Sequence, residues 1–367
     1  GIMLIAACSP PGSLWASEFG AYDALSYHLQ LAKEWAAGPA GRLWPGEHNV
    51  YSYLPSYMEA AFAHLGVLAG GFNPVVPLVD RMLADDGYWV YGCQFLHVGM
   101  GIIAAIAVAR LVRTLAAHAG LIEADHRLAV LGGLAGAALL LGTPWTIVVG
   151  SLAYNELAML AMIAGALLCA ADPDLSAWRR GAIAGLLVGI AASAKPTALI
   201  LAGPMVALAL VAWPIRANLR FRNAAVIAGA GTITGLAAIM PWLVRNALAS
   251  GNPVFPFAAG TLGRGHWTQE QIDRYARNHA PEGSLIERLQ LLLSSRGFTH
   301  EQWAFTPWMA ALALAMALAW RPTRWAAGVL AAGVAVPLVA GVTFTHLQSR
   351  FLMPALGPMA AGVRLGV

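Results

Sequence analysis

Long apolar runs separated by short polar segments dominate the chain. A membrane-spanning α-helix needs about 20 mostly apolar residues, and most of the runs reach or approach that length. Strands of a membrane barrel would instead show short alternating segments. The pattern therefore predicts an all-α, polytopic transmembrane helical bundle. After an incomplete first span at 1–15, we expect spans at 89–112, 128–149, 155–171, 181–194, 196–213, 223–244, 305–320 and 325–343, and an incomplete last one from Phe351.

The run 181–213 is interrupted by Lys195-Pro196, so it forms either one overlong helix or two short ones. With two helices, ten arginines between the runs fall on one side of the membrane, which the positive-inside rule makes cytoplasmic. These are Arg110, Arg113, Arg127, Arg179, Arg180, Arg216, Arg220, Arg222, Arg321 and Arg324. A single span would break this segregation, so we predict two helices with Lys195-Pro196 at their outer turn.

Two long polar segments, 16–88 and 245–304, face the extracytoplasmic side under this topology. Apolar residues at helical spacing in 22–36 and 53–69 predict two helices that lie in the plane of the membrane interface. The second segment has mixed charge and a length typical of binding loops or lids. We expect one transmembrane domain over 1–367, of about ten spans, with the first and last incomplete because the chain begins and ends inside apolar stretches.

The composition supports a membrane protein and excludes several other classes. Hydrophobic residues make up 59% of the chain and charged residues 11%, against about 25% charged residues in a typical soluble domain. The net charge is +4, but the basic residues are spread over short loops and form no patch with aromatics, so we expect no nucleic-acid partner. The three cysteines are far apart, which argues against a disulfide framework or a CxxC metal site.

Charged residues near span ends are informative because acidic residues are scarce, with 18 Asp or Glu in 367 residues. A carboxylate or an ammonium beside a hydrophobic span is costly unless it has a partner or a function. Asp23 follows the first span, Glu156 opens a later one, and Lys195 lies at the helix break. Arg245 and Arg350 also fall on the outer side, so the unusual polar residues converge on one face.

Six short motifs, taken in order, cover nearly the whole chain. They are Tyr22-Asp23-Ala-Leu-Ser-Tyr-His28, Ala153-Tyr154-Asn155-Glu156-Leu157-Ala158, Ala194-Lys195-Pro196-Thr197, Pro241-Trp242-Leu-Val-Arg245-Asn246, Gly251-Asn252-Pro253-Val-Phe-Pro256-Phe257 and Ser349-Arg350-Phe-Leu-Met-Pro354. Together they resemble the GT-C glycosyltransferases that use polyprenyl-phosphate sugars. That group includes protein O-mannosyltransferases, lipid A aminoarabinose transferases and many uncharacterised bacterial homologues.

The resemblance implies a GT-C fold in the cell inner membrane, an active site on the extracytoplasmic face, and inversion at the sugar carbon. It also implies a catalytic Asp in the first outer loop, a position that Asp23 matches. Many relatives have two adjacent acids there, whereas here Glu18 stands five residues before Asp23. Glu156 matches the second-loop acid of the group.

Each charged candidate has a possible role in sugar transfer and a purely structural alternative. Asp23 could be the general base that takes a proton from the acceptor hydroxyl, or simply the N-cap of the interfacial helix. Glu156 could orient the acceptor or help Asp23 hold a divalent cation, or be a charge favoured by the helix dipole. Lys195, Arg245 and Arg350 could contact the donor phosphate, or be ordinary outer-side charges.

Aromatic residues of the first outer loop are the candidate substrate-binding residues. Tyr27, His28 and Tyr57 could contact the sugar, or could belong to an interfacial aromatic belt. The spacing of His28 and His48 is not a metal-ligand pattern. These patterns require no cofactor. The one cofactor that the sequence leaves open is a divalent cation.

The first functional hypothesis is therefore a membrane glycosyltransferase that moves a sugar from a polyprenyl-phosphate donor to an extracytoplasmic lipid, glycan or protein. One alternative is a transporter or flippase of a lipid-linked substrate, which would have polar residues at mid-membrane and repeated halves. Another is a catalytically silent GT-C-like subunit of a larger membrane complex. Polar residues at span ends and the lack of a repeat favour the enzyme.

Overall fold

The computed structural model describes residues 1–18, 20–38, 42–69, 88–121, 126–215, 221–281 and 283–366. Every regular element in these residues is helical, which confirms the predicted fold class. The elements are α1 (Ile2–Ala6), η1 (Ala16–Glu18), η2 (Ala24–His28), α2 (Leu29–Ala37), η4 (Val50–Tyr53), α3 (Tyr57–Leu68), α5 (Tyr88–His118), α7 (His126–Gly142), α8 (Pro144–Gly150), α9 (Glu156–Ala171), α10 (Ala177–Ala194), α11 (Ala198–Leu201), α12 (Gly203–Ile215), α13 (Phe221–Ser250), α14 (Ala259–Leu262), α15 (Gln269–His279), α16 (Leu285–Leu292), η5 (Glu301–Trp303), α17 (Thr306–Ala319), α18 (Arg324–Phe344), η6 (Ser349–Ala355) and α19 (Leu356–Gly366).

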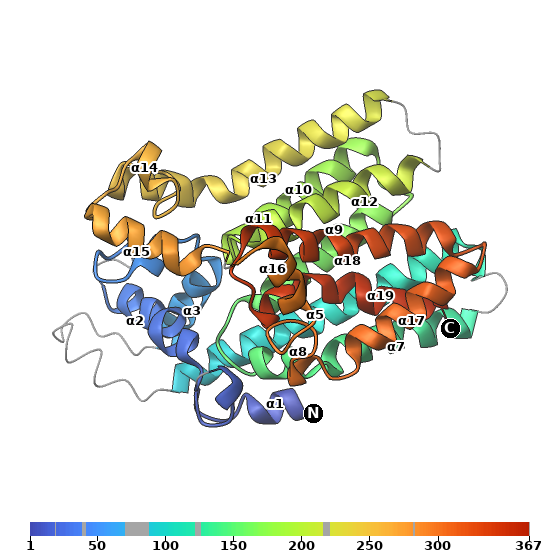
Figure 1. Ribbon diagram of the computed structural model, residues 1–367, viewed down its shortest axis with the longest axis horizontal. Helices are drawn as coiled ribbons and strands as arrows, with labels where there is room; N and C mark the ends of the chain where they lie inside the picture. Colours follow the sequence, from blue (N-terminus) through green and yellow to red (C-terminus); the bar gives the residue numbers. More distant parts are fainter. Residues whose placement is uncertain are drawn as a thin grey trace.

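The long apolar helices lie side by side along the long axis of the molecule (Figure 1). In the described residues α5, α13 and α18 are long and apolar enough to cross a membrane, and α7 with α8 would add a fourth span bent by 60°. The predicted span 128–149 is thus broken, because Pro144 starts a new helix and cannot donate to the preceding turn. The helices α9, α12 and α17 are shorter, and the count of ten spans stays a prediction.

The chain breaks at Lys195-Pro196 as predicted. Helix α10 ends at Ala194, Lys195 has extended backbone angles, and the chain resumes as α11 and α12. Proline disfavours the helical conformation of the residue before it, which explains where α10 ends. The break leaves Lys195 at the end of a helix rather than inside one. Arg216 and Arg220, used above to orient the chain, lie outside the described residues.

Helix α13 packs along α10 through glycines on both helices. A Cβ placed on Gly185 would lie only 2.1 Å from the carbonyl oxygen of Gly231, so any side chain there would force the helices apart. Such small residues let helix backbones approach closely within a bilayer. Helix α13 also continues to Ser250, six residues beyond the predicted span, and ends where Gly251 adopts a φ of +77°.

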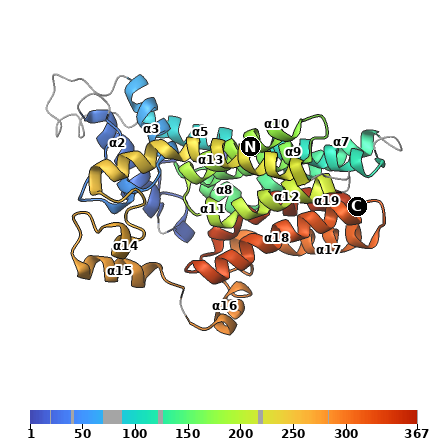
Figure 2. The ribbon, with the colours of Figure 1, turned by 90° about the horizontal axis from the view of Figure 1, so that it is seen from above.

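The two long polar segments form short helices, most of which lie at one end of the bundle. The first polar segment contains η2, α2, η4 and α3, and the second contains α14, α15 and α16. In both views α2, α3, α14 and α15 lie at the same end, opposite the turn between α17 and α18 (Figures 1 and 2). Residues 70–87 of the first segment lie outside the described residues.

Helix α9 forms the centre of the bundle. Apolar residues are buried on all of its faces, as expected for a helix surrounded by others, and it contacts α5, α10 and α12. Its first residue, Glu156, is consequently held at a fixed position within the bundle, at the point where the first polar segment meets the ends of the long helices.

Candidate functional site

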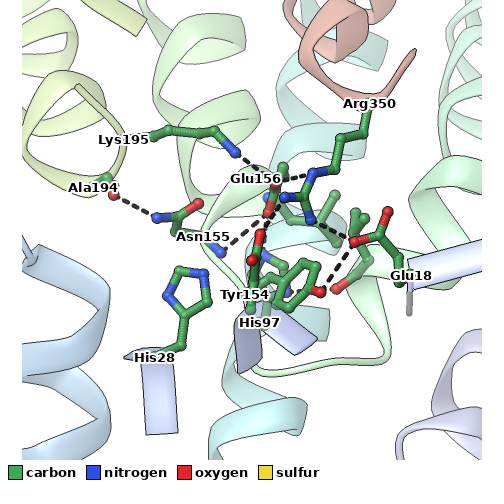
Figure 3. A network of polar contacts seen from close by, with 12 residues as sticks. Glu18, His28, His97, Tyr154, Asn155, Glu156, Ala194, Lys195 and Arg350 are labelled. Atoms are coloured by element: carbon green, nitrogen blue, oxygen red, sulfur yellow. Dashed lines mark hydrogen bonds and ion pairs between the residues drawn. The ribbon is translucent and has the colours of Figure 1, made fainter. Parts of the chain in front are cut away.

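Charged side chains from four distant parts of the chain meet in one cluster (Figure 3). The guanidinium of Arg350, in η6, forms ion pairs with the carboxylates of Glu18 and Asp23. Its Nε lies 4.0 Å from Glu156 Oε1. The same Glu156 oxygen lies 2.5 Å from Lys195 Nζ. The cluster therefore joins four of the five charged residues predicted for the site, together with Glu18.

Ion pairs between opposite charges stabilise the cluster. Its side chains are largely shielded from water, and an unpaired charge there would be costly. Burial alone would lower the pKa of Arg350, but the carboxylates of Glu156, Asp23 and Glu18 hold it well above its usual value. Burial raises the pKa of Glu18, and Arg350 opposes that rise. Arg350 is therefore the permanent positive charge that holds the three acids together.

Aromatic rings complete the surroundings of the two cations. The Tyr154 hydroxyl donates a hydrogen bond of 3.0 Å to Glu18 Oε2, and its ring lies 5.3 Å from the Arg350 guanidinium. The ring of Phe351 lies 5.1 Å from Lys195 Nζ and 5.6 Å from Arg350. Such ring faces attract cations. Burial, followed by the charge of Glu18, raises the pKa of Tyr154, which keeps its hydroxyl protonated as a donor.

A completely buried histidine of α5 fixes the turn that carries Tyr154 and Glu156. His97 Nδ1 lies 3.0 Å from the Val149 carbonyl oxygen and 2.9 Å from that of Leu152, so Nδ1 must carry a proton. His97 Nε2 accepts from the Leu157 N–H at 2.9 Å, so it must be unprotonated. The ring is therefore neutral, with its proton on Nδ1. Our sequence reasoning missed His97, although a histidine inside an apolar run was a signal.

The structure shows the contacts of the two predicted acids, and their roles stay predictions. Asp23 precedes the π-helical turn η2, but its side chain makes no capping hydrogen bond and pairs with Arg350 instead. Glu156 is the first residue of α9, and its carboxylate faces Lys195 and Arg350. Within the described part of the chain, no group of three or more His, Cys, Asp or Glu side chains is placed to hold a metal ion.

Arg245 lies outside the cluster, and its guanidinium contacts backbone carbonyl groups rather than the charged groups of the cluster. Its Nη2 donates to the carbonyl oxygens of Ser52 and Leu54 at 2.8 and 3.0 Å. The neighbouring Asn246 donates to the Tyr53 carbonyl at 2.5 Å. This arrangement connects the end of α13 to the turn η4 of the first polar segment. The Arg-Asn motif thus contacts backbone, and a phosphate contact for Arg245 stays a prediction.

The predicted aromatic residues divide between the border of the cluster and the surface. The Tyr27 ring stacks on Tyr51 at 4.5 Å between centroids. His28 is buried, with Nδ1 2.5 Å from Glu59 Oε1 and its ring 5.3 Å from that of Tyr154. Tyr57, at the start of α3, keeps 49% of its surface exposed. Tyr27 and His28 therefore border the cluster, and Tyr57 is mainly at the surface.

A cavity of about 390 Å³ adjoins the cluster on one side. Arg350 and Glu18 belong to both its wall and the cluster. The residues that line it do not include Asp23, Glu156 or Lys195. Arg350 is therefore positioned between a cavity and the Glu156–Lys195 pair.

The sequence matches no protein-family model and no characterised protein, but two solved structures are similar. ArnT from Cupriavidus metallidurans in the apo state aligns with a TM-score of 0.56 and 14% identity, over 92% of this chain and 54% of that one. The chain has the ArnT fold. For ArnT bound to undecaprenyl phosphate the TM-score is 0.48, with 17% identity over 95% and 60% of the chains. The chain thus spans just over half the length of the ArnT chains it matches.

The similarity to ArnT confirms the predicted resemblance at the level of the fold. ArnT is the lipid A aminoarabinose transferase, a member of the GT-C group whose motifs the sequence resembles. The multi-pass helical membrane fold predicted from the apolar runs is therefore present. At this identity the likeness concerns the fold, and the chemistry must be argued from the cluster.

Proposed function

We propose that the chain is an inverting membrane glycosyltransferase that moves a sugar from a polyprenyl-phosphate donor to an acceptor at the extracytoplasmic face. The observation that carries the proposal is the position of Arg350, which contacts Asp23 and reaches Lys195 through Glu156. A candidate base and two candidate phosphate-binding cations thereby lie in one cluster. The ArnT fold supports the same assignment. The position of the cluster at helix ends favours an enzyme over a transporter.

Lys195 and Arg350 are suited to hold the donor phosphate. Negative charge grows on the phosphate oxygen as its bond to the sugar carbon breaks, and cations aimed at that oxygen stabilise the transition state. The two cations lie on either side of Glu156, which contacts both. We assign Glu156 the role of positioning them, rather than of taking part in proton transfer.

Asp23 is the best placed of the three carboxylates to act as the base. Its side chain is 21% exposed, against 8% for Glu18 and 2% for Glu156, so an acceptor could reach it. The acceptor oxygen would attack the sugar carbon while its proton passes to Asp23. The bond from the sugar carbon to the phosphate oxygen breaks, and its electron pair stays on the lipid phosphate.

The ion pair with Arg350 engages one carboxylate oxygen of Asp23, which would otherwise be open to the acceptor hydroxyl. A donor phosphate would compete with Asp23 for the same guanidinium. Binding of the donor would therefore release Asp23 to accept a proton, while Glu18 keeps its hydrogen bond from Tyr154. In this scheme the base becomes effective when the donor is bound.

Sugar transfer tests the proposal directly. Membranes that contain the full-length protein would be given a panel of radiolabelled polyprenyl-phosphate sugars, and wild type compared with Asp23→Asn. Loss of a general base predicts a rate lower by about 10²–10⁴-fold. Asp273→Asn, at an exposed position of α15, is the matched control and should keep full activity. Equal rates for wild type and Asp23→Asn would move the base elsewhere. No transfer with any donor would favour the silent subunit.

A further inference from the structure

A second pocket, separate from the cavity beside the cluster, lies against the turn η2. Its volume is about 340 Å³, within the range of small ligand sites. The helices η2 and α2, the start of α5 and the loop after α1 line it. Its lining includes Leu25, Leu29, Gln30, Lys33, Trp89 and Tyr91. None of the described residues that line it belongs to the charged cluster.

One face of η2 and α2 enters the pocket. Leu25, Leu29 and Lys33 each follow the one before by four positions, so they form a row along the helix. Asp23 stands two positions before Leu25 and therefore lies on nearly the opposite face, where its carboxylate pairs with Arg350. The turn η2 thus faces the cluster with one side and the pocket with the other.

The pocket is mainly apolar and contains one charged group, the ammonium of Lys33. The sequence has two lysines, of which Lys195 in the cluster is the other. Lys33 is half-buried and has no ion pair or hydrogen bond among the described residues. Its neighbour Glu34 does not line the pocket and instead contacts His48 and Gln30. Because a charge on partly covered apolar surface needs a partner, the pocket suits a ligand with an anionic group.

From the pocket, an exposed apolar stripe continues along α5. Tyr91, Phe95, Ile102 and Ile106 recur every four or seven positions, which places them on one face of the helix. Phe95, Ile102 and Ile106 keep 41%, 42% and 55% of their surfaces exposed, and α5 is long and apolar enough to cross a membrane. The stripe is about 22 Å long, more than the roughly 15 Å of hydrocarbon in one leaflet. It can therefore contact a lipid acyl chain along its length.

We propose that the pocket binds an anionic phospholipid of the bilayer, with its phosphate against Lys33 and an acyl chain along the stripe of α5. Trp89 and Tyr91 at the start of α5 are residue types typical of the level of lipid head groups. The lipid is distinct from the polyprenyl-phosphate donor, because Lys195 and Arg350 do not line the pocket. It connects η2 to α5 and thereby stabilises the turn behind Asp23.

Lipid binding to the full-length protein tests the inference. Delipidated protein in detergent would be titrated with phosphatidylglycerol or phosphatidylcholine, and the bound lipids counted by native mass spectrometry. We expect wild type to hold one phosphatidylglycerol about fivefold more tightly than phosphatidylcholine, which corresponds to about 1 kcal/mol for one lysine at an anionic lipid. Lys33→Gln should lose this preference, and Lys33→Arg should keep it. The control, Arg42→Gln, removes an exposed charge of the first polar segment outside the pocket.

Three further measurements separate the lipid from its head group, from the donor and from unspecific attraction. Glycerol phosphate, which has no acyl chains, should bind much more weakly than phosphatidylglycerol, because it cannot contact the stripe. Saturating undecaprenyl phosphate should leave the phosphatidylglycerol bound. Phosphatidylglycerol should also raise the midpoint of thermal unfolding more in wild type than in Lys33→Gln, since a ligand that binds only the folded state stabilises it.

The inference is overturned if wild type shows no preference for phosphatidylglycerol, if Lys33→Gln keeps the preference, or if Arg42→Gln loses it to the same extent. Glycerol phosphate that binds as tightly as the lipid would refute the role of the stripe. Displacement by undecaprenyl phosphate would assign the pocket to the donor instead, and a dimer without bound lipid would identify a second copy of the chain as the occupant. Because sugar transfer is not measured, the inference and the proposed function can fail separately.

Discussion

Arg245 is buried and Arg350 is largely buried, with 12% of its side chain exposed, and both were predicted from sequence as contacts of the donor phosphate. Arg350 has carboxylate partners, which a phosphate can replace because it offers the same kind of charged oxygen. Arg245 has backbone carbonyl partners, which depend on the fold and have no net charge to exchange. The class of partner therefore separates an arginine suited to a substrate from one that organises the chain.

Substitution of Arg350 should have the largest effect. Arg350→Gln leaves Glu18, Asp23 and Glu156 facing one another, and loss of one partner of a buried ion pair costs about 3–5 kcal/mol. Arg350→Lys keeps a charge but loses the fork that contacts two carboxylates. We expect this milder variant to fold and to transfer sugar about 10²–10³-fold more slowly, the cost of removing one transition-state donor. Initial rates in membranes check this, and a Lys variant at wild-type rate would refute the assignment.

Substitution of Arg245 should affect stability rather than chemistry. Arg245→Gln removes charge-assisted hydrogen bonds to the first polar segment, with a loss in stability of about 1.5–3 kcal/mol. Thermal unfolding in detergent should show a lower midpoint, whereas the rate per folded molecule and the donor KM should stay near wild type. A normal midpoint with a raised donor KM would show instead that Arg245 contacts the phosphate, as the sequence predicted.

The two arginines also show which features could be predicted from the sequence and which could not. Apolar runs predicted the helices, and Pro196 predicted the end of α10, because both effects are local. Arg350 and Glu18 are 332 positions apart, and no local pattern shows that they pair. The role of His97 depends on two carbonyls and one N–H of a turn over 50 residues away, so only its unusual place in an apolar run was visible. The cavity combines side chains of four separate segments and left no sequence signal.

Substitution of His97 should have an intermediate effect, because His97 holds the turn that positions Glu156 and Tyr154. His97→Ala would leave the buried Leu157 N–H without an acceptor, at a cost of about 1–3 kcal/mol. We expect a smaller kcat with an unchanged donor KM, and partial rescue in His97→Asn, whose side chain has both a donor and an acceptor. His266→Asn, at an exposed histidine, is the control. Equal loss in the Ala and Asn variants would contradict a role that depends on these hydrogen bonds.

The smallest effect concerns the pH dependence of stability at Glu18. Burial raises the pKa of Glu18 above the ordinary value of 4.5, so the folded state binds this proton more tightly than the unfolded state. The corresponding stability is fully present below pH 4.5 and is lost as the pH rises through the folded pKa. Glu18→Gln cannot ionise, so this decline should disappear and the midpoint of thermal unfolding should fall less with rising pH. The Arg350 ion pair opposes the effect, which makes the expected change small. A steeper decline in the Gln variant would mean that Arg350, not burial, dominates the environment of Glu18, and that the acid stabilises the cluster mainly through its charge.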